Sequence, residues 1–235
     1  MKISLLLPTR GRPQFAQRLL QSVVNTAGDI KDIEVVLFVD EDDPDSHTIA
    51  HPLLSIAKIV GAPGQTMGLM NNACAKASCG RYLMLINDDA VFRTRQWDRR
   101  IRESFAAFPD DVALVYGNDL DQGIAVPTFP VVSRVFCDVL GELCPQGYRN
   151  LHIESHLLDI FKELGRRNHH RICYLPDVVV EHMHHVLGKA ALDATYRKKD
   201  QRRDDWLFIA LDDDRALEAR RLARYIEARQ SAGSR

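Results

Sequence analysis

Two clusters of residues in this chain of 235 residues carry side chains that can bind metal ions or move protons. The first is the acidic turn Asn87-Asp88-Asp89, and the second is the run Glu181-His182-Met183-His184-His185. Mg²⁺ and Mn²⁺ bind oxygen ligands and take few protein carboxylates, because water and phosphate oxygens fill the rest of their shell. Asp89 can supply such a carboxylate. A strand would place His182 and His184 on one side, so either can be a further ligand of the same ion.

Polar and charged residues also follow the first two strands that the sequence predicts. Strand 3–7 leads into Pro8-Thr9-Arg10-Gly11-Arg12, and strand 33–39 leads into Asp40-Glu41-Asp42-Asp43. In an open α/β sheet, ligands bind in the crevice at the carboxyl ends of the strands, where these residues and the turn at 87–89 would converge. Acidic turns also occur on exposed loops, where water screens their mutual repulsion. Their position after apolar strands favours a binding site.

The elements that must position these residues alternate between short apolar runs and helical stretches in the first half of the chain. Continuous apolar runs are typical of parallel strands that helices cover on both faces. The alternation predicts right-handed βαβ units around a mostly parallel sheet, so the predicted fold class is α/β. The predicted strands are residues 3–7, 33–39, 58–60 and 82–86, and the predicted helices between them are 14–25, 46–57 and 68–77.

The pattern changes in the second half of the chain. Residues 123–150 contain several prolines and glycines and show weak periodicity, which indicates loops and short helices that line a substrate site. A helical apolar stripe predicts a helix over 153–164, which Gly165 would terminate. The remaining predicted elements are helices 97–108 and 203–229, strands 112–116, 172–175 and 178–180, and a frayed end at 231–235.

The composition is that of an ordinary globular protein, with 46% hydrophobic and 27% charged residues and a formal net charge of −1. This length fits one compact domain, which we place at residues 1–230, with a disordered tail at 231–235. The near-zero charge excludes a global attraction to nucleic acid or to anionic membranes. The five cysteines lack paired spacing and are expected to be reduced packing residues. With no membrane-length apolar run and no secretory cleavage site, we expect a cytoplasmic protein.

Several segments resemble family 2 glycosyltransferases, which have the GT-A fold. The segments that carry the resemblance are Ser4-Leu-Leu-Leu-Pro-Thr-Arg-Gly-Arg-Pro13, the strand end Phe38-Val39-Asp40, Tyr82-Leu-Met-Leu-Ile-Asn-Asp-Asp89, and the preceding Asn72-Ala-Cys-Ala-Lys-Ala-Ser-Cys-Gly80-Arg-Tyr82. The resemblance covers residues 1–125 well and 150–186 more loosely. It implies a Rossmann-like, mostly parallel sheet with flanking helices, an irregular segment on the acceptor side and a C-terminal helix.

The resemblance also implies a role for each strand end. The turn after the first strand would line the nucleotide site, the acidic residue after the second would contact the nucleobase, and the Asp-x-Asp-like turn would hold ribose and metal. The nucleotide-sugar-binding residues would then be Pro8, Thr9, Arg10, Asp40, Asn72, Asn87 and Asp88. Asn87 stands where the family has its first aspartate, so Asn87 or Asp88 would meet the ribose. Asp89 would bind Mn²⁺ or Mg²⁺.

In the same family, an acidic residue at the head of a late helix acts as general base and a histidine after a late strand completes the metal shell. These roles would fall on Glu154 and on His182, with His184 next. An inverting transfer needs a carboxylate that takes the proton of the acceptor hydroxyl, which agrees with Glu154. The competing candidates for the base are Asp119, Asp121 and Asp138.

These features predict a metal-dependent glycosyltransferase with a UDP- or GDP-linked donor. Residues 1–125 would bind the donor, 126–186 would hold the acceptor and the base, and 187–230 would form a helical extension. Basic segments at 93–102, 166–171 and 197–203 fit an acceptor that is a glycan, a lipid-linked sugar or modified DNA, and a location peripheral to a membrane. One alternative is a metal-dependent hydrolase that uses the His182–His185 cluster. The other is a non-catalytic nucleotide-binding module.

Overall fold

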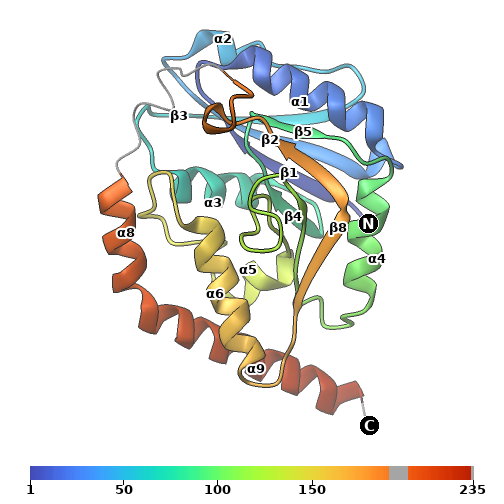
Figure 1. Cartoon of the computed structure of the whole chain (residues 1–235), viewed down its shortest axis with the longest axis vertical. Coiled ribbons are helices and arrows are strands. Elements are labelled where there is room, and N and C mark those ends of the chain that lie inside the picture. Colours follow the sequence, from blue (N-terminus) through green and yellow to red (C-terminus); the bar gives the residue numbers. More distant parts are fainter. Residues whose placement is uncertain (191–200, 234–235) are drawn as a thin grey trace.

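The computed structural model describes residues 1–190 and 201–233 of the chain. Within this part, one mixed sheet has the strand order β3-β2-β1-β4-β7-β6-β8-β5 (Figure 1). Its strands are β1 (Ile3–Pro8), β2 (Ile33–Asp40), β3 (Ser55–Gly61), β4 (Tyr82–Leu85), β5 (Ala90–Phe92), β6 (Leu114–Asn118), β7 (Val131–Ser133) and β8 (Ile172–His182). Strands β1 to β4 are mutually parallel, β7 is antiparallel to β4 and β6, and β5 is antiparallel to β8. The predicted α/β class with a mostly parallel sheet is confirmed.

Helices cover both faces of this sheet. They are α1 (Pro13–Thr26), α2 (Pro44–His47), α3 (Met67–Ala77), α4 (Trp97–Ala106), α5 (Arg134–Leu140), α6 (Ile153–Gly165), α8 (Gln201–Ala210) and α9 (Asp212–Gly233), with short 3-10 turns η1 (Ile30–Asp32) and η2 (His185–Leu187). Side chains alternate along a strand, so Leu5 and Leu7 of β1 join the core under α1 and α4, whereas Leu6 joins the core under α3, α5, α6 and α9. Burial on both faces explains why β1, β2 and β4 are mostly apolar, and the buried Ser4 of β1 donates a hydrogen bond to the buried Glu34 of β2.

The helix predicted for residues 46–57 is wrong. In the structure α2 contains only Pro44–His47, and β3 occupies Ser55–Gly61. Pro52 disfavours the helical conformation of His51 and has no N–H to donate, so a helix cannot continue through this segment. Strand β3 lies at the edge of the sheet and is half-buried or exposed along its length. It therefore lacks the continuous apolar run that identifies the buried strands.

The second half of the chain contains more regular structure than its sequence indicates. Strand β7 and helix α5 lie within the irregular segment 123–150. In the first half of the chain, the short strand β5 after the acidic turn was likewise not predicted. The strands predicted at 172–175 and 178–180 form the single strand β8, whose pairing with β6 jumps from Leu175 to Val179. This bulge accommodates Pro176, which cannot donate to a ladder. Strand β6 begins at Leu114, two residues later than predicted.

The C-terminal prediction also needs correction. The helix predicted for 203–229 is two helices, α8 and α9, and α9 continues to Gly233. The frayed end predicted at 231–235 is therefore wrong for residues 231–233, while 234–235 lie outside the described residues. Residues 191–200 of the predicted extension 187–230 also lie outside them. Among the helices that the structure describes, none combines the length and the apolar character that crossing a bilayer requires.

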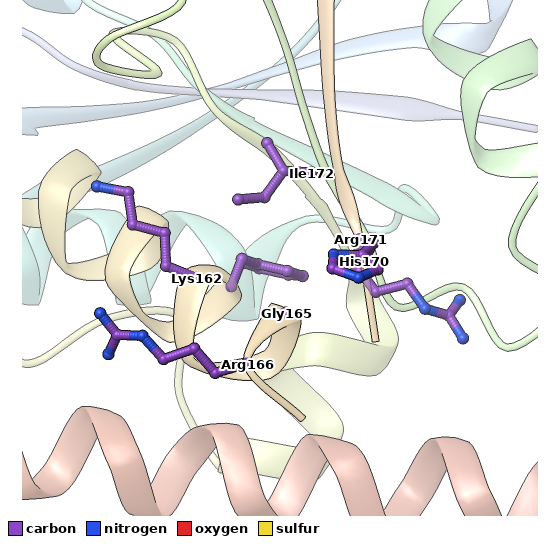
Figure 2. Close-up of a pocket in the computed structure, with 7 residues that line it drawn as sticks. Lys162, Gly165, Arg166, His170, Arg171 and Ile172 are labelled. Carbon is purple, nitrogen blue, oxygen red and sulfur yellow. The ribbon is translucent and has the colours of Figure 1, made fainter. Parts of the chain in front are cut away.

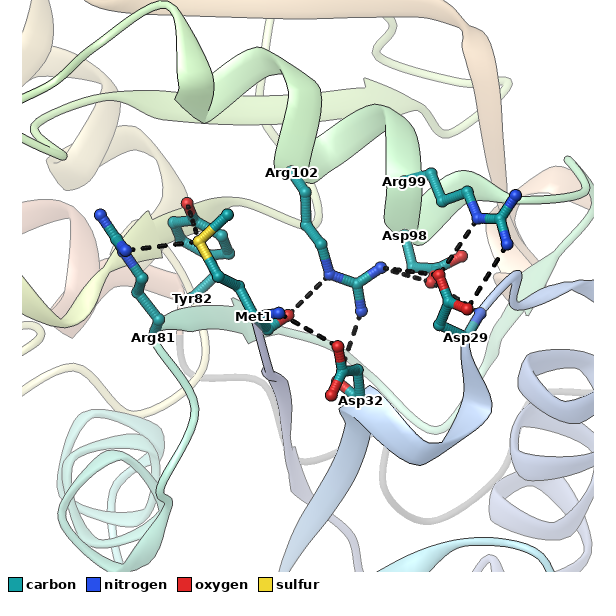
Figure 3. Close-up of polar contacts among 8 residues, drawn as sticks. All are labelled: Met1, Asp29, Asp32, Arg81, Tyr82, Asp98, Arg99 and Arg102. Carbon is teal, nitrogen blue, oxygen red and sulfur yellow. Dashed lines mark hydrogen bonds and ion pairs between the residues drawn. The ribbon is translucent and has the colours of Figure 1, made fainter.

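Asp98, in the first turn of α4, fastens this helix to the loop between α1 and β2. Its fully buried carboxylate accepts hydrogen bonds from the backbone N–H groups of Gly28 at 2.6 Å and Asp29 at 3.1 Å. The guanidinium of Arg102, one turn further along α4, donates a third at 2.6 Å (Figure 3). One side chain thus joins a helix, a loop and a nearly buried cation.

We expect Asp98→Ala to lower the free energy of unfolding by about 3 kcal/mol, because it leaves two backbone donors and a nearly buried guanidinium without their acceptor. Asp98→Asn, which keeps one acceptor oxygen, should cost less. The matched control is Glu103→Ala on the same helix, whose side chain is 70% exposed and whose loss should cost less than about 0.5 kcal/mol. Urea unfolding measures all three. Equal midpoints for Asp98→Ala and the control would contradict this role.

Candidate functional site

The carboxyl ends of β1, β2 and β4 meet at one edge of the sheet, because these neighbouring strands are parallel (Figure 1). Pro8 and Asp40 end β1 and β2, and Thr9 continues the ladder by donating its backbone N–H to the Phe38 carbonyl at 3.0 Å. Asn87 lies in the turn that follows β4. The polar strand ends recognised in the sequence therefore lie at the edge where open α/β sheets bind their ligands.

Asp88 is the buried centre of the polar cluster after β1 and β4. Its carboxylate accepts a hydrogen bond from Thr9 Oγ1 at 2.8 Å and lies 3.2 Å from the guanidinium of Arg12, which is itself buried. Burial raises the pKa of Asp88 to about 6, although Arg12 acts in the opposite direction. These contacts tie the acidic turn to the loop after β1. Sequence reasoning did not assign Arg12 a role, and its place in the polar turn after β1 was the available signal.

Arg10 pairs with the acidic turn after β2. Its guanidinium lies 2.5 Å from the Asp40 carboxylate and forms two hydrogen bonds to the Asp42 carboxylate. The hydrogen bonds to Asp42, and to a smaller extent the one to Asp40, raise the pKa of Arg10. His47 Nε2 contacts the backbone carbonyl of Asp40 at 2.8 Å. Asp40 is buried, whereas Arg10 is partly exposed. A planar guanidinium fixed on two carboxylates is a suitable surface for stacking a nucleobase.

Asp89 and His182 are brought together by β5. The antiparallel register of β5 and β8 sets Ala90 opposite His182, and the backbone N–H of Met183 donates to the Asp89 carbonyl at 2.8 Å. His182 Nε2 consequently lies 3.4 Å from Asp89 Oδ1, with the two side chains 15% and 4% exposed. Two atoms that each bind one ion at about 2.1 Å can be separated by such a distance. The structure thus brings Asp89 and His182 together, and their metal-binding roles remain predictions.

A second acidic turn reaches His182 from β6, on the other side of β8. The backbone N–H of His182 donates to the Asp119 carbonyl at 3.0 Å. A carboxylate oxygen of Asp119, one of Asp121 and a ring nitrogen of His182 all lie within 4.8 Å of one another. Asp119 is buried and accepts hydrogen bonds from the backbone N–H groups of Asp121 and Gly123, whereas Asp121 is exposed.

This turn was recognised in the sequence only as an alternative source of the general base. Its place beside His182 depends on the parallel pairing of β6 and β8, which the sequence does not specify. The signal that could have pointed to metal binding is the Asp-Leu-Asp spacing directly after a strand, since it repeats the chemistry of the turn at Asp89.

The ring of His182 has the surroundings of a metal ligand. Its Nε2 is buried and makes no hydrogen bond to any residue in the described ranges. The ring also packs edge-on against Phe129, with a centroid separation of 5.5 Å, which fixes its orientation. A buried ring nitrogen among carboxylates fits a divalent cation, which binds neutral imidazole and carboxylate oxygens.

His184 lies beside His182, with 5.1 Å between the ring centroids. Its Nδ1 accepts the backbone N–H of Val186 at 3.3 Å and so caps the short turn η2. In the part of the chain that the structure describes, the cluster able to hold a metal includes His182 but not His184 or His185. Metal ligation by His184 remains a prediction.

Asn72 fastens α3 to the loop that precedes α6. Its amide oxygen accepts the backbone N–H groups of Leu143 at 2.9 Å and Cys144 at 3.2 Å, and its amide nitrogen donates to the Cys144 carbonyl at 2.7 Å. These bonds occupy the amide group. The structure thus gives Asn72 a role in holding this loop, and its contact with a nucleotide remains a prediction.

Glu154 lies half-buried in the first turn of α6. The loop before this helix packs on the start of α3, where Gly68 donates its backbone N–H to the Tyr148 carbonyl at 3.0 Å. Helix α3 begins shortly after the carboxyl end of β3, so α6 also begins at that edge of the sheet (Figure 1). Glu154 therefore lies in a helix that begins near the start of α3, and its role as general base remains a prediction.

A cavity of about 520 Å³ lies elsewhere, between the end of α6 and the start of β8 (Figure 2). It is lined by Phe161, Lys162, Gly165, Arg166, His170, Arg171 and Ile172. Ile172 begins β8 and His182 ends it, so the cavity is roughly 30 Å from the Asp89–His182 pair at ordinary strand rise. It takes no part in this site.

Several solved structures resemble this chain. TarS 1–349 of S. aureus in complex with UDP matches with a TM-score of 0.59 and 15% identity, over 77% of this chain and 59% of that one. The same TarS fragment in complex with UDP-GlcNAc matches with a TM-score of 0.60 and 14% identity, over 96% and 72%. The mannosyltransferase PcManGT from Pyrobaculum calidifontis, in complex with GDP-Man and Mn²⁺, matches with a TM-score of 0.60 and 14% identity, over 99% and 79%.

These matches concern the fold, because the identities are low. No family model and no curated protein matches the sequence. The chain spans less than two thirds of the TarS structure with UDP. The strand order, the helices on both faces and the long C-terminal helix agree with the similarity to these enzymes. The chain therefore has the GT-A fold of glycosyltransferases that its sequence predicted.

Proposed function

We propose that this chain is a metal-dependent glycosyltransferase that moves a sugar from a nucleotide-sugar donor to an acceptor hydroxyl. The observation that carries the proposal is the meeting of Asp89 Oδ1 and His182 Nε2, 3.4 Å apart, at the ligand-binding edge of a GT-A sheet. The polar ends of β1 and β2 lie at the same edge. Residues 1–125 would bind the donor, 126–186 would form the acceptor side, and 187–230 would be a helical extension.

The donor in this proposal is a UDP- or GDP-linked sugar. The paired Arg10 and Asp40 would face the nucleobase, because together they offer a flat cation and a buried acceptor. Pro8, Thr9 and the Asn87 amide would line the ribose and phosphate side. Solved structures of similar fold contain UDP, UDP-GlcNAc or GDP-Man, which supports a donor of this class.

Asp89 and His182 would hold a divalent metal, with Mn²⁺ or Mg²⁺ as the candidates. The buried Nε2 of His182 and the neighbouring carboxylates of Asp89, Asp119 and Asp121 supply the oxygen and nitrogen ligands that such an ion accepts. When bound, the ion would neutralise the negative charge that develops on the diphosphate. The structure of PcManGT, which has a similar fold, is a complex with GDP-Man and Mn²⁺, which supports a divalent metal as cofactor.

Glu154 would act as the general base of an inverting transfer. Its carboxylate would take the proton from the acceptor hydroxyl while the hydroxyl oxygen forms a bond to the anomeric carbon. The bond from that carbon to the diphosphate oxygen breaks, and the nucleoside diphosphate leaves. The acceptor would be a glycan, a lipid-linked sugar or modified DNA.

Thermal unfolding with UDP or GDP, each with and without Mn²⁺, tests this proposal directly. A ligand present at about 100 times its Kd stabilises the folded state by about 2.7 kcal/mol. For a domain of this size we expect one of the two nucleotides to raise Tm by roughly 5–10 °C, and only when Mn²⁺ is present. A Tm that neither nucleotide changes, with or without metal, would contradict a nucleotide-sugar site.

The alternatives predict other outcomes. A non-catalytic module would show the same thermal shift, but it would neither transfer the sugar of a donor nor show even slow donor hydrolysis. A hydrolase built on the histidine cluster receives less support. Among the described residues, the group that could hold a metal ion consists of Asp119, Asp121 and His182, and it includes neither His184 nor His185. Stoichiometric zinc in the purified protein would favour the hydrolase.

A further inference from the structure

Helix α8 presents an exposed face that combines large apolar side chains with arginines. Trp206 is 72% exposed and Ile209 is 63% exposed. At 3.6 residues per turn, Arg202, Trp206 and Ile209 lie along one stripe of the helix, and the exposed Arg203 lies beside it. Exposure of these two apolar side chains to water is unfavourable, and their burial against another surface would lower the free energy.

The orientation of this face is fixed by the opposite side of α8. Asp204 is fully buried, and its carboxylate accepts the backbone N–H groups of Arg149 at 2.9 Å, Asn150 at 2.8 Å and Leu151 at 2.9 Å. Leu207 and Phe208 pack against the core that α6 and α9 share. Trp206 therefore points outward because the rest of the helix is anchored.

The charges around this face fit a negatively charged partner. Arg202 and Arg203 stand at the N-terminal end of α8 and are both exposed. Asp205 faces His152, with 2.7 Å between Oδ1 and the ring Nε2. The acidic run 212–214 lies beyond the opposite end of the helix, at the start of α9.

We propose that the exposed face of α8, formed by Arg202, Arg203, Trp206 and Ile209, docks on the surface of an anionic lipid membrane. Tryptophan is favoured at the boundary between headgroups and acyl chains, and arginines next to it bind lipid phosphates. Asp204 ties α8 to residues 149–151, directly before the helix that carries Glu154. Docking would thus bring the candidate site close to the headgroups. The inference that docking places the candidate site near a lipid-linked acceptor rests on the proposed function.

Vesicle co-sedimentation of the full chain tests the docking without any donor or metal. Vesicles of phosphatidylcholine alone are compared with vesicles that also contain phosphatidylglycerol. We expect binding to the anionic vesicles that weakens as NaCl is added. The double variant Trp206→Ser/Ile209→Ser should lower the partition coefficient about tenfold or more. Arg202→Gln and Arg203→Gln should each lower it by about fivefold.

Leu217→Ser is the matched control, because Leu217 is an exposed apolar residue of α9, 55% exposed, outside the α8 face. It should bind like the unaltered chain, and thermal unfolding should show that all variants are folded. Absent binding, equal binding to both vesicle types, or no effect of the double variant would each overturn the proposal. Light scattering tests whether a second copy of the chain covers α8 instead. If the unaltered chain were a dimer and the double variant a monomer, a second copy would be the partner of this face. Because no sugar transfer is measured, these outcomes are independent of the catalytic assignment.

Discussion

Asp89→Asn is expected to lower the rate of sugar transfer by about 10³-fold, because it removes a carboxylate that holds the charge-neutralising ion and such ions contribute several kcal/mol at the transition state. The same variant should lose the extra thermal stabilisation that Mn²⁺ gives with UDP or GDP. Asparagine has the size of aspartate, and the backbone carbonyl of residue 89 still accepts the N–H of Met183. The effect should therefore come from lost ligation, with little change in the stability of the metal-free protein.

Glu41→Gln is the matched control for this experiment. Glu41 lies in the acidic turn after β2 and is exposed, so its change removes one negative charge near the site without touching the Asp89–His182 pair. Donor hydrolysis and the Mn²⁺-dependent thermal shift should both stay as they are in the unaltered chain. If Asp89→Asn behaved like this control in both measurements, Asp89 would not be a metal ligand.

His182 belongs to two candidate ligand sets, one with Asp89 and one with Asp119 and Asp121. His182→Ala should weaken Mn²⁺ binding under either arrangement. Asp121→Asn separates them, because Asp121 is exposed and its change costs little stability. Unchanged Mn²⁺ binding in Asp121→Asn assigns the ion to Asp89 and His182, whereas a loss equal to that of Asp89→Asn assigns it to all three carboxylates.

The sequence predicted the sheet best where burial alone defines the strands. Strands β1, β2 and β4 are buried along their length and mostly apolar because helices cover both of their faces, so their ends, and the polar turns after them, were located closely. Strand β5 was missed because Ala90–Phe92 is too short to show a period. Yet β5 sets Asp89 beside His182. The sequence could propose these two ligands, but their contact depends on a pairing between segments about 90 residues apart.

Roles that depend on hydrogen bonds between distant segments were also beyond sequence reasoning. Asn72 was expected to bind the nucleotide, yet its amide holds the loop at Leu143 and Cys144, which comes some 70 residues later. Arg12 was not assigned, although it is buried against Asp88. In both cases the residue type suggested a polar role. The sequence could not identify the hydrogen-bond partner, because the group that satisfies a buried polar side chain lies far away along the chain.

Glu154→Gln should lower kcat by about 10³-fold and leave the thermal shift with nucleotide and Mn²⁺ unchanged, because a positioned general base contributes about 10²–10⁴-fold and takes no part in donor binding. Glutamine keeps the shape of the side chain and cannot accept the proton of the acceptor hydroxyl. A purely structural role for Glu154 would instead lower the stability of the variant or reduce its thermal shift with nucleotide and Mn²⁺.

Asp138→Asn gives the sharpest comparison, because Asp138 competes for the same role and lies exposed on α5. We expect this variant to keep the rate of the unaltered chain. If Asp138→Asn lost the activity while Glu154→Gln kept it, the base would be Asp138, and α5 would border the acceptor in place of α6. If neither variant changed the rate while Asp89→Asn still abolished transfer, the donor site would stand and the proton would leave through another group. Asp119 and Asp121 are the remaining candidates. Asp121 is exposed, whereas the buried Asp119 carboxylate already accepts the backbone N–H groups of Asp121 and Gly123, so a substitution of Asp119 would have to be judged against a loss of folding stability.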